Sequence, residues 1–210
     1  MTTRKRKSGV ERKSEIVDTA IGIASELGPD RLTMQHLADK IGISQPAIFR
    51  HFPTKSDVWQ SVAERIAQLL QGAAKGAGRA GQSPAQQLKS QVAAQLGFIQ
   101  NNPAIPAILF SRELHAENES LRRFFAGLMA GRHRTLSGLI QQEITRGGFR
   151  ADLDPDDAAY LILTLIQGLA MRWSLSARSF DLQLEGTRLL ELQLTAFQNF
   201  SPKHPPGMRH

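Results

Sequence analysis

Apolar positions along the chain recur at helical spacing, and no segment keeps the strict alternation of a half-buried strand. Between residues 11–27, for example, Ile16, Ala20, Ile23 and Ala24 fall on one face of a helix. The sequence contains neither an Asn-Gly nor an Asp-Gly pair, the dipeptides that most strongly indicate a β-hairpin. The pattern therefore predicts an all-α protein.

Turn and capping residues divide the chain into about nine predicted helices. Gly28-Pro29, Pro53 and Gly147-Gly148 end helices, and the segment 72–84, rich in Gly, Ala and Ser, reads as a connector. The predicted helices span residues 11–27, 34–41, 45–52, 55–70, 84–101, 103–115, 118–146, 155–177 and 181–199.

Two short helices within residues 33–52, joined by Gly-Ile-Ser, have the layout of a helix-turn-helix. In the second helix, Ile48 and Phe52 lie four residues apart and are expected to pack on the first helix. The exposed arc then contains Gln45, Pro46, Ala47, Phe49, Arg50 and His51. Glutamine pairs with adenine, and arginine pairs with guanine or phosphate. Spacing alone leaves open an ordinary exposed amphipathic helix.

Composition and charge narrow the function class. The chain has no cysteine, which excludes disulfides and thiolate chemistry and favours a reducing cytoplasm. We find no uninterrupted apolar run of the roughly 18 residues that a membrane span needs. The net charge is +7, and residues 1–13 contribute +5 of it. A basic arm on a nearly neutral body suggests a polyanion partner such as nucleic acid, and a solvated tail is the alternative.

The stretch TMQHLADKIGISQPAIFRHFPTKSDVW, which begins at Thr33, strongly resembles the DNA-binding region of the tetracycline-repressor (TetR) family. The resemblance covers about residues 12–58, and the remaining chain fits the family only in length and helical layout. The positions that match the family pattern are Thr33, Ala38, Gly42, Ile43, Ser44, Ile48, His51, Phe52 and Lys55.

This resemblance implies a basic arm over residues 1–10, a helix-turn-helix DNA-binding domain over 11–57, a helical ligand-binding and dimerisation domain over 58–200, and a flexible tail over 201–210. It places Thr33 and Lys55 on phosphates and Gln45, Pro46 and Ala47 over bases. Phe49 stands where the family usually has tyrosine, so it offers apolar contact only. The predicted DNA-binding residues are Thr33, Ser44, Gln45, Pro46, Ala47, Phe49, Arg50, His51 and Lys55, together with Arg4, Lys5 and Arg6 of the arm.

The segment 157–173 is apolar on nearly all sides and must therefore be covered on more than one face. A central core helix of a monomer would satisfy this requirement. The resemblance implies instead that the last two helices of two chains form a four-helix interface, as suits a homodimer that reads a palindromic operator in double-stranded DNA.

The segment 95–130 mixes apolar residues with a few polar ones, the composition of a small-molecule pocket and also of any helical core. The resemblance implies an effector site between the middle helices but does not identify its residues. Our candidates for ligand contact are Phe98, Phe110, Ser111, Leu114, His115, Phe125, Met129 and Trp173.

We expect no catalytic residues, metal or cofactor. Glu113, His115 and Glu117 are spaced two residues apart. Side chains two apart on a helix point about 200° from one another, which does not suit a shared metal ion. The leading hypothesis is a cytoplasmic, sequence-specific DNA-binding regulator. The resemblance implies that it is a repressor that a small molecule releases from DNA. Three alternatives stay open: a helical enzyme that uses His115, a non-specific nucleoid-type binder, and a small-molecule carrier with a vestigial helix-turn-helix.

Overall fold

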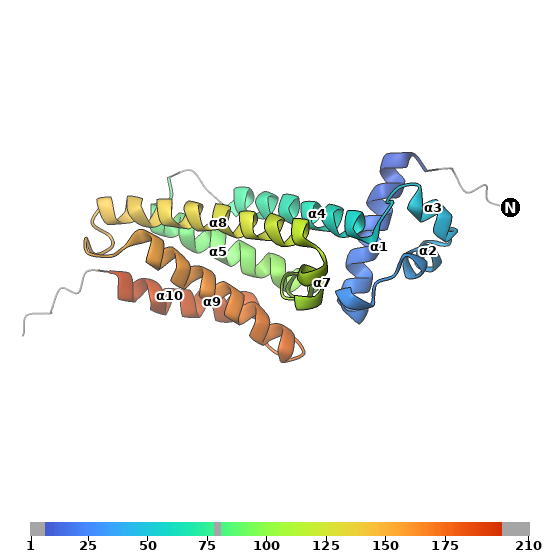
Figure 1. The fold of residues 1–210 in the computed structure, drawn as a ribbon. Coiled ribbons are helices and arrows are strands. Elements are labelled where there is room, and N and C mark those ends of the chain that lie inside the picture. The colour runs from blue at the N-terminus through green and yellow to red at the C-terminus, as the bar shows by residue number, and fades with distance from the viewer. Residues whose placement is uncertain (1–6, 78–80, 199–210) are drawn as a thin grey trace, which may run out of the picture.

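The computed structural model describes residues 7–77 and 81–198, and every regular element in these two ranges is helical. Figure 1 shows a small head at one end, built from α1, α2 and α3, and a long body of packed helices, with α4 running from one to the other. The elements are α1 Gly9–Leu27, η1 Pro29–Arg31, α2 Met34–Ile41, α3 Gln45–Phe49, α4 Lys55–Ala77, α5 Pro84–Asn101, α6 Ala104–Leu109, α7 Arg112–Glu117, α8 Glu119–Thr145, α9 Pro155–Leu175 and α10 Leu182–Phe197.

Local capping fixes the start and end of the head helices. Ser8 and Glu11 form a reciprocal capping box at the start of α1. At the start of α2, the hydroxyl of Thr33 accepts a hydrogen bond from the backbone N–H of His36 at 3.1 Å. Gly42 ends α2 with φ 73°, a left-handed conformation that glycine adopts without steric cost. The Thr33 and Gly42 contacts bound α2 at the predicted residues 34–41, whereas α1 begins two residues before its predicted start.

Three differences from the prediction exceed two residues or divide a helix. The helix expected over 45–52 is α-helical only to Phe49, although the N–H of Phe52 still donates to the carbonyl of Ile48 at 3.0 Å. The fourth helix continues to Ala77, because alanine-rich sequence tolerates the glycines of the expected connector. The helix expected over 103–115 breaks at Ser111, whose extended backbone caps a separate α7. The described chain therefore holds ten α-helices instead of nine.

The body is a set of long helices in mutual contact. α5 packs on α4, α8 and α10, and α9 packs on α8 and α10. A Cβ atom at Gly186 of α10 would clash with Leu96 of α5, so this glycine permits the close approach of the two helices. The head joins the body through α1, which contacts both α4 and α6, with Trp59 fully buried in α4.

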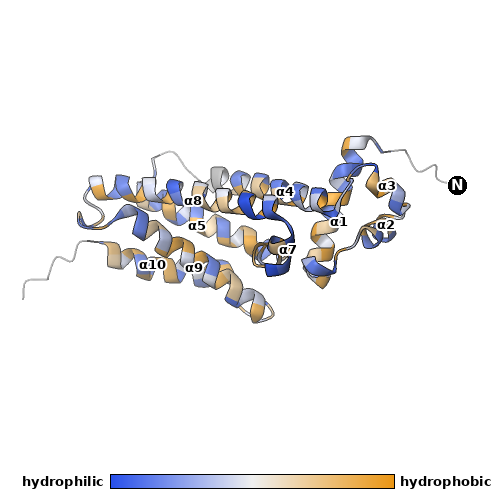
Figure 2. Ribbon diagram, viewed as in Figure 1, coloured by the Kyte–Doolittle hydropathy of each residue, from blue (hydrophilic) through white to orange (hydrophobic). Residues whose placement is uncertain are grey.

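One helix of the body meets the length and composition of a membrane span, although polar residues interrupt its apolar sequence. α9 has a mean hydropathy of 1.3 over its most apolar window, enough by length and composition to cross a membrane, and 44% of that window is buried in the protein. Core helices satisfy the same criterion. In Figure 2 much of α9 and α10 is coloured as hydrophobic. Several of these side chains are exposed in the single chain: Tyr160, Leu161, Met171, Leu175, Leu184 and Leu192.

Candidate DNA-binding surface and ligand cavity

The surface of the head is organised by the turn between α2 and α3. The N–H of Ile43 donates to the carbonyl of Ala38 at 3.0 Å, which closes the turn after Gly42 and fixes the direction of α3. Ile48 is fully buried and Phe52 is 4% exposed, so these two side chains anchor α3 on the head's core as the spacing predicts.

The opposite side of α3 faces solvent. Pro46 and Arg50 are exposed, and Phe49 leaves 42% of its surface in water, a large exposure for an aromatic residue. Half-buried positions on the same short helix and the turn after it are Gln45, Ala47 and His51.

Ser44 occupies the N-cap position of α3, but its side chain makes no capping hydrogen bond. Its exposed hydroxyl is therefore available to another acceptor or donor. Lys55 begins α4, where the hydroxyl of Thr54 accepts from the N–H of Asp57 at 3.1 Å. Within residues 7–77 and 81–198, neither Lys55 nor Arg50 has an ion-pair partner.

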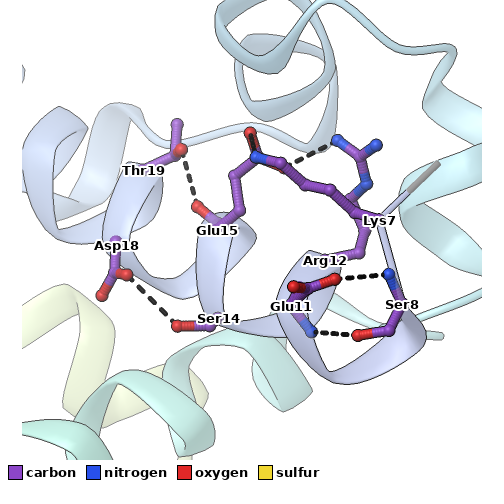
Figure 3. A network of polar contacts seen from close by, with 8 residues as sticks. All are labelled: Lys7, Ser8, Glu11, Arg12, Ser14, Glu15, Asp18 and Thr19. Atoms are coloured by element: carbon purple, nitrogen blue, oxygen red, sulfur yellow. Dashed lines mark hydrogen bonds and ion pairs between the residues drawn. The ribbon is translucent and has the colours of Figure 1, made fainter. Parts of the chain in front are cut away.

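Arg4, Lys5 and Arg6, the predicted DNA-binding residues of the basic arm, lie outside the described residues, and so does the predicted tail. The described part of the basic segment is partly neutralised (Figure 3). Lys7 reaches Glu15 at 2.7 Å, and Arg12 reaches the other oxygen of the same carboxylate at 2.6 Å. The hydrogen bond from Lys7 holds the pKa of Glu15 below its usual range, with Arg12 contributing its charge.

Lys13 is one functional candidate that sequence reasoning missed. Its ammonium lies 5.6 Å from the centroid of the Phe52 ring, at the end of the helix-turn-helix, and the side chain remains exposed. A lysine in this place adds positive charge beside α3. Only the fold brings these positions together, because they are 39 residues apart in sequence.

A cavity of about 510 Å³ with a mainly apolar lining lies in the body between α4, α5 and α8. Its volume is within the range of small-molecule sites. The lining residues are Leu70, Gln71, Gln91, Gln95, Gly127, Leu128, Met129, Gly131, Arg132 and Thr135. Of the eight residues predicted to contact a ligand, Met129 lies here.

Arg132 dominates the electrostatics of this cavity. Its Nε donates to Gln95 Oε1 at 3.0 Å, its Nη1 donates to Gln91 Oε1 at 2.7 Å, and its Nη2 is buried with no hydrogen-bond partner. Burial lowers the pKa of Arg132 to about 10, so the guanidinium still carries its charge at pH 7. That shift corresponds to about 3 kcal/mol of unfavourable desolvation.

A second, smaller cavity of about 30 Å³ lies between α5, α6 and α9. It shares Gln95 and Met129 with the larger cavity, and Phe110, another predicted contact, belongs to its wall. The amide nitrogen of Gln167 donates to the sulfur of Met129 at 3.3 Å, and the Met129 side chain lines both cavities.

Ser111 has a different position from the one expected. Its hydroxyl donates to Asp30 Oδ1 at 2.8 Å and accepts from the N–H of Leu114 at 3.1 Å. Asp30 belongs to η1 in the head, and Ser111 caps α7 in the body. A single hydroxyl therefore links the two parts of the molecule across 81 residues of sequence.

The five remaining ligand candidates line neither cavity. Leu114 and Phe125 are buried in the core, and Phe98 packs against it. His115 donates from Nε2 to the carbonyl of Leu109 at 2.9 Å. Trp173 donates from Nε1 to the carbonyl of Phe180 at 3.0 Å, which stabilises the turn from α9 to α10. These side chains have structural partners that the sequence pattern did not reveal.

Comparison with known proteins matches both parts of the chain. Residues 16–62 fit the model of bacterial regulatory proteins of the tetR family, and residues 84–189 fit the C-terminal model of BetI-type transcriptional repressors. The nucleoid occlusion factor SlmA of Haemophilus ducreyi is 30% identical over 168 residues, which are 80% of this chain and 83% of that protein.

Solved structures show the same fold at lower identity. A TetR transcription regulator from Haloarcula marismortui has a TM-score of 0.78 at 20% identity, covering 90% of this chain and 100% of the other. A transcriptional regulator from Saccharomonospora viridis, in complex with choline, also has a TM-score of 0.78 at 20% identity, covering 89% and 96%. With the helix-turn-helix head and the helical body, these matches show that the chain belongs to the TetR family of DNA-binding transcription regulators, which are not enzymes.

Proposed function

We propose that this regulator is a homodimeric repressor in the cytoplasm that binds a palindromic operator and leaves it when a small molecule fills the body. The observation that carries the proposal is the solvent-facing side of α3, where Phe49 and Arg50 are exposed and Arg50 has no ion pair among the described residues. In this proposal residues 11–57 bind DNA and residues 58–200 bind the ligand and the second chain.

The DNA contacts divide by chemistry. Gln45, Pro46 and Ala47 are proposed to read base edges, and Phe49 to cover a sugar or a thymine methyl group. Phosphates are proposed to bind the remaining predicted residues, which are Thr33, Ser44, Arg50, His51 and Lys55, with Arg4, Lys5 and Arg6 of the arm. Two heads that read a palindrome would lie about 34 Å apart, or farther if more than one dimer binds.

The exposed stripe on α9 supports the dimer. Leu161, Thr164, Gly168, Met171 and Leu175 recur at alternate spacings of three and four residues, and all five are exposed in the single chain. This spacing is that of a helix-packing seam, and the small residues in its middle permit close approach. Leu184 and Leu192 of α10, 72% and 61% exposed, extend the apolar surface. A second copy of the same face would cover it.

The contacts of α6 suggest how ligand binding in the body could change the position of the head. Ile105, Pro106 and Leu109 line the smaller cavity, and α6 packs on α1. Immediately after α6, Ser111 holds Asp30 of the head. A ligand that displaces α6 would therefore move the head relative to the body, and it would release DNA to the extent that it prefers the displaced arrangement.

Paired substitutions test the DNA assignment. Binding sites selected from a random duplex pool would be measured by fluorescence anisotropy at about 150 mM salt, against shuffled duplexes. Gln45→Ala is expected to relax base preference at one position. Lys55→Ala is expected to weaken binding to all duplexes and to reduce the salt slope by about 0.9. Equal affinity for selected and shuffled duplexes would refute sequence-specific binding and favour the nucleoid-type alternative.

Similarity to SlmA of Haemophilus ducreyi over 80% of this chain supports a second candidate, a nucleoid occlusion factor. A repressor predicts a few bound sites beside promoters, whereas nucleoid occlusion predicts many sites spread over the chromosome. Chromatin immunoprecipitation of the tagged protein, combined with imaging of division septa in a deletion strain, separates the two. Septa that form over the chromosome in that strain would favour nucleoid occlusion.

A further inference from the structure

A single charged residue determines which polar group of a ligand the larger cavity can bind. Among the described residues that line it, Arg132 alone is charged, and no carboxylate is present. Its Nη2 group is buried and makes no hydrogen bond, which leaves a strong donor without an acceptor. Burial lowers the pKa of Arg132 only to about 10, so the charge remains at neutral pH.

The two neighbouring amides strengthen this preference. Gln91 and Gln95 each direct the side-chain oxygen to the guanidinium of Arg132. Their acceptor atoms are therefore occupied, and their NH₂ groups are left to donate. The polar group of a ligand that approaches Arg132 meets hydrogen-bond donors on all three side chains, and this arrangement is complementary to an anion.

The same lining is unsuited to a cation. Quaternary ammonium ions bind in aromatic cages or beside carboxylates, and this cavity has neither among its described lining residues. The Saccharomonospora viridis regulator was crystallised with choline, which is a cation of this kind. The lining of the present cavity does not suit such a ligand.

The remaining walls suit an apolar body. Leu70, Leu128 and Met129 line the larger cavity beside Arg132. Beyond Met129 the smaller cavity continues with Ile99, Leu109 and other apolar side chains towards α6. Met129 is an unbranched side chain that can change rotamer, so an apolar chain could extend past it.

We infer that the cavity takes an amphipathic carboxylate, with its two oxygens on Arg132 and the amides of Gln91 and Gln95 and its apolar body along Leu128 and Met129. One guanidinium with neutral neighbours matches a single negative charge, which favours a carboxylate over the nearly doubly charged phosphate monoester. The inference rests on the proposed function, because it names the ligand class of the proposed effector site.

The test uses four probes that share one ten-carbon chain: decanoate, decanol, decyl phosphate and decyltrimethylammonium. Calorimetric titration of the full chain is expected to give at least 10-fold tighter binding for decanoate than for each of the others. Arg132→Met is expected to weaken decanoate binding 10-fold to 100-fold and to leave the affinity for decanol unchanged. Unchanged decanol binding would also show that the variant is folded. Arg132→Lys should recover part of the loss. The control Arg123→Met, on the exposed side of α8, should change nothing.

Equal binding of decanoate and decanol, tighter binding of the cation or the phosphate, or full decanoate affinity in Arg132→Met would each overturn the inference. Failure of the proposed function looks different. If decanoate binds through Arg132 but leaves operator affinity unchanged, the carboxylate site stands and ligand-controlled release fails. If an uncharged or cationic compound releases DNA while decanoate does not bind, the carboxylate assignment fails and the repressor stands.

Discussion

The hydrogen bond between Ser111 and Asp30 joins the head to the body, and removing it gives the sharpest test of ligand coupling. The Ser111 hydroxyl makes two bonds, one to the carboxylate at 2.8 Å and one to the first turn of α7 at 3.1 Å. Loss of an N-cap costs about 1 kcal/mol, and loss of a charge-assisted bond to an exposed carboxylate costs about 1 kcal/mol more. Ser111→Ala should therefore lower the free energy of unfolding by about 2 kcal/mol, and Asp30→Ala by about 1 kcal/mol.

A double-mutant cycle isolates the shared bond. The double variant should lose about 2 kcal/mol instead of the additive 3, which leaves an interaction energy of about 1 kcal/mol. Urea denaturation measures all four proteins. Operator affinity with and without saturating ligand then measures coupling, which should fall by up to about 5-fold in each single variant, the equivalent of 1 kcal/mol.

The chain offers a matched control pair. Ser137 donates to Asp156 Oδ1 at 2.6 Å, with the same chemistry but within the body, between α8 and the start of α9. Ser137→Ala and Asp156→Ala should change stability and leave the ligand effect on operator affinity intact. Additive stabilities for Ser111 and Asp30 within about 0.5 kcal/mol, or an equal loss of coupling in the control pair, would refute the assigned route.

Three further outcomes follow from local geometry. Leu161→Glu should convert the proposed dimer to a monomer in sedimentation velocity, whereas Leu27→Glu on α1 should not, because both leucines are about half exposed but only the first lies on the α9 stripe. Gly42→Ala should lower the free energy of unfolding by about 1–2 kcal/mol because φ is 73°, while Gly22→Ala, mid-helix with open space, should raise it slightly. At pH values above the usual pKa of a glutamate, Glu15→Gln should lower the free energy of unfolding by under about 1 kcal/mol. This difference between the variant and the original protein should vanish as the pH falls through the lowered pKa of Glu15.

The head was predictable because its signals are local. Thr33, Gly42 and the Thr54–Asp57 pair each act within four residues, so the sequence determines caps and turns before any long-range contact forms. The same locality explains the limited errors at helix boundaries. The expected helix over 103–115 could not be divided from apolar spacing alone, because Ser111 turns the chain through its contact with a residue in the head.

The cavity was not predictable in this way. Arg132 contacts Gln95 and Gln91, which precede it by 37 and 41 positions on another helix. In sequence, Arg132 appears only as a polar interruption after an apolar stretch. In the same kind of surroundings, the Ser111 hydroxyl, the Nε2 of His115 and the Nε1 of Trp173 each bond Asp30 or a backbone carbonyl, whereas the Nδ1 of His115 is also buried without a partner. Which polar side chain lacks a partner is a property of the packed fold.

A buried arginine with one donor unbonded is costly to a fold that gains nothing from it. The lowered pKa of Arg132 corresponds to about 3 kcal/mol of desolvation, a large share of the 5–15 kcal/mol that holds a typical domain together. Methionine could fill much of the same space without that cost, and the loss of the two hydrogen bonds to Gln91 and Gln95, at about 1 kcal/mol each, would offset part of the gain. We therefore expect Arg132→Met to raise the unfolding free energy of the unliganded protein while it removes carboxylate binding, a stability gain and a functional loss from one substitution. If the variant is instead less stable without ligand, the guanidinium is a structural bridge between α5 and α8, and its unbonded donor is no sign of a missing anion.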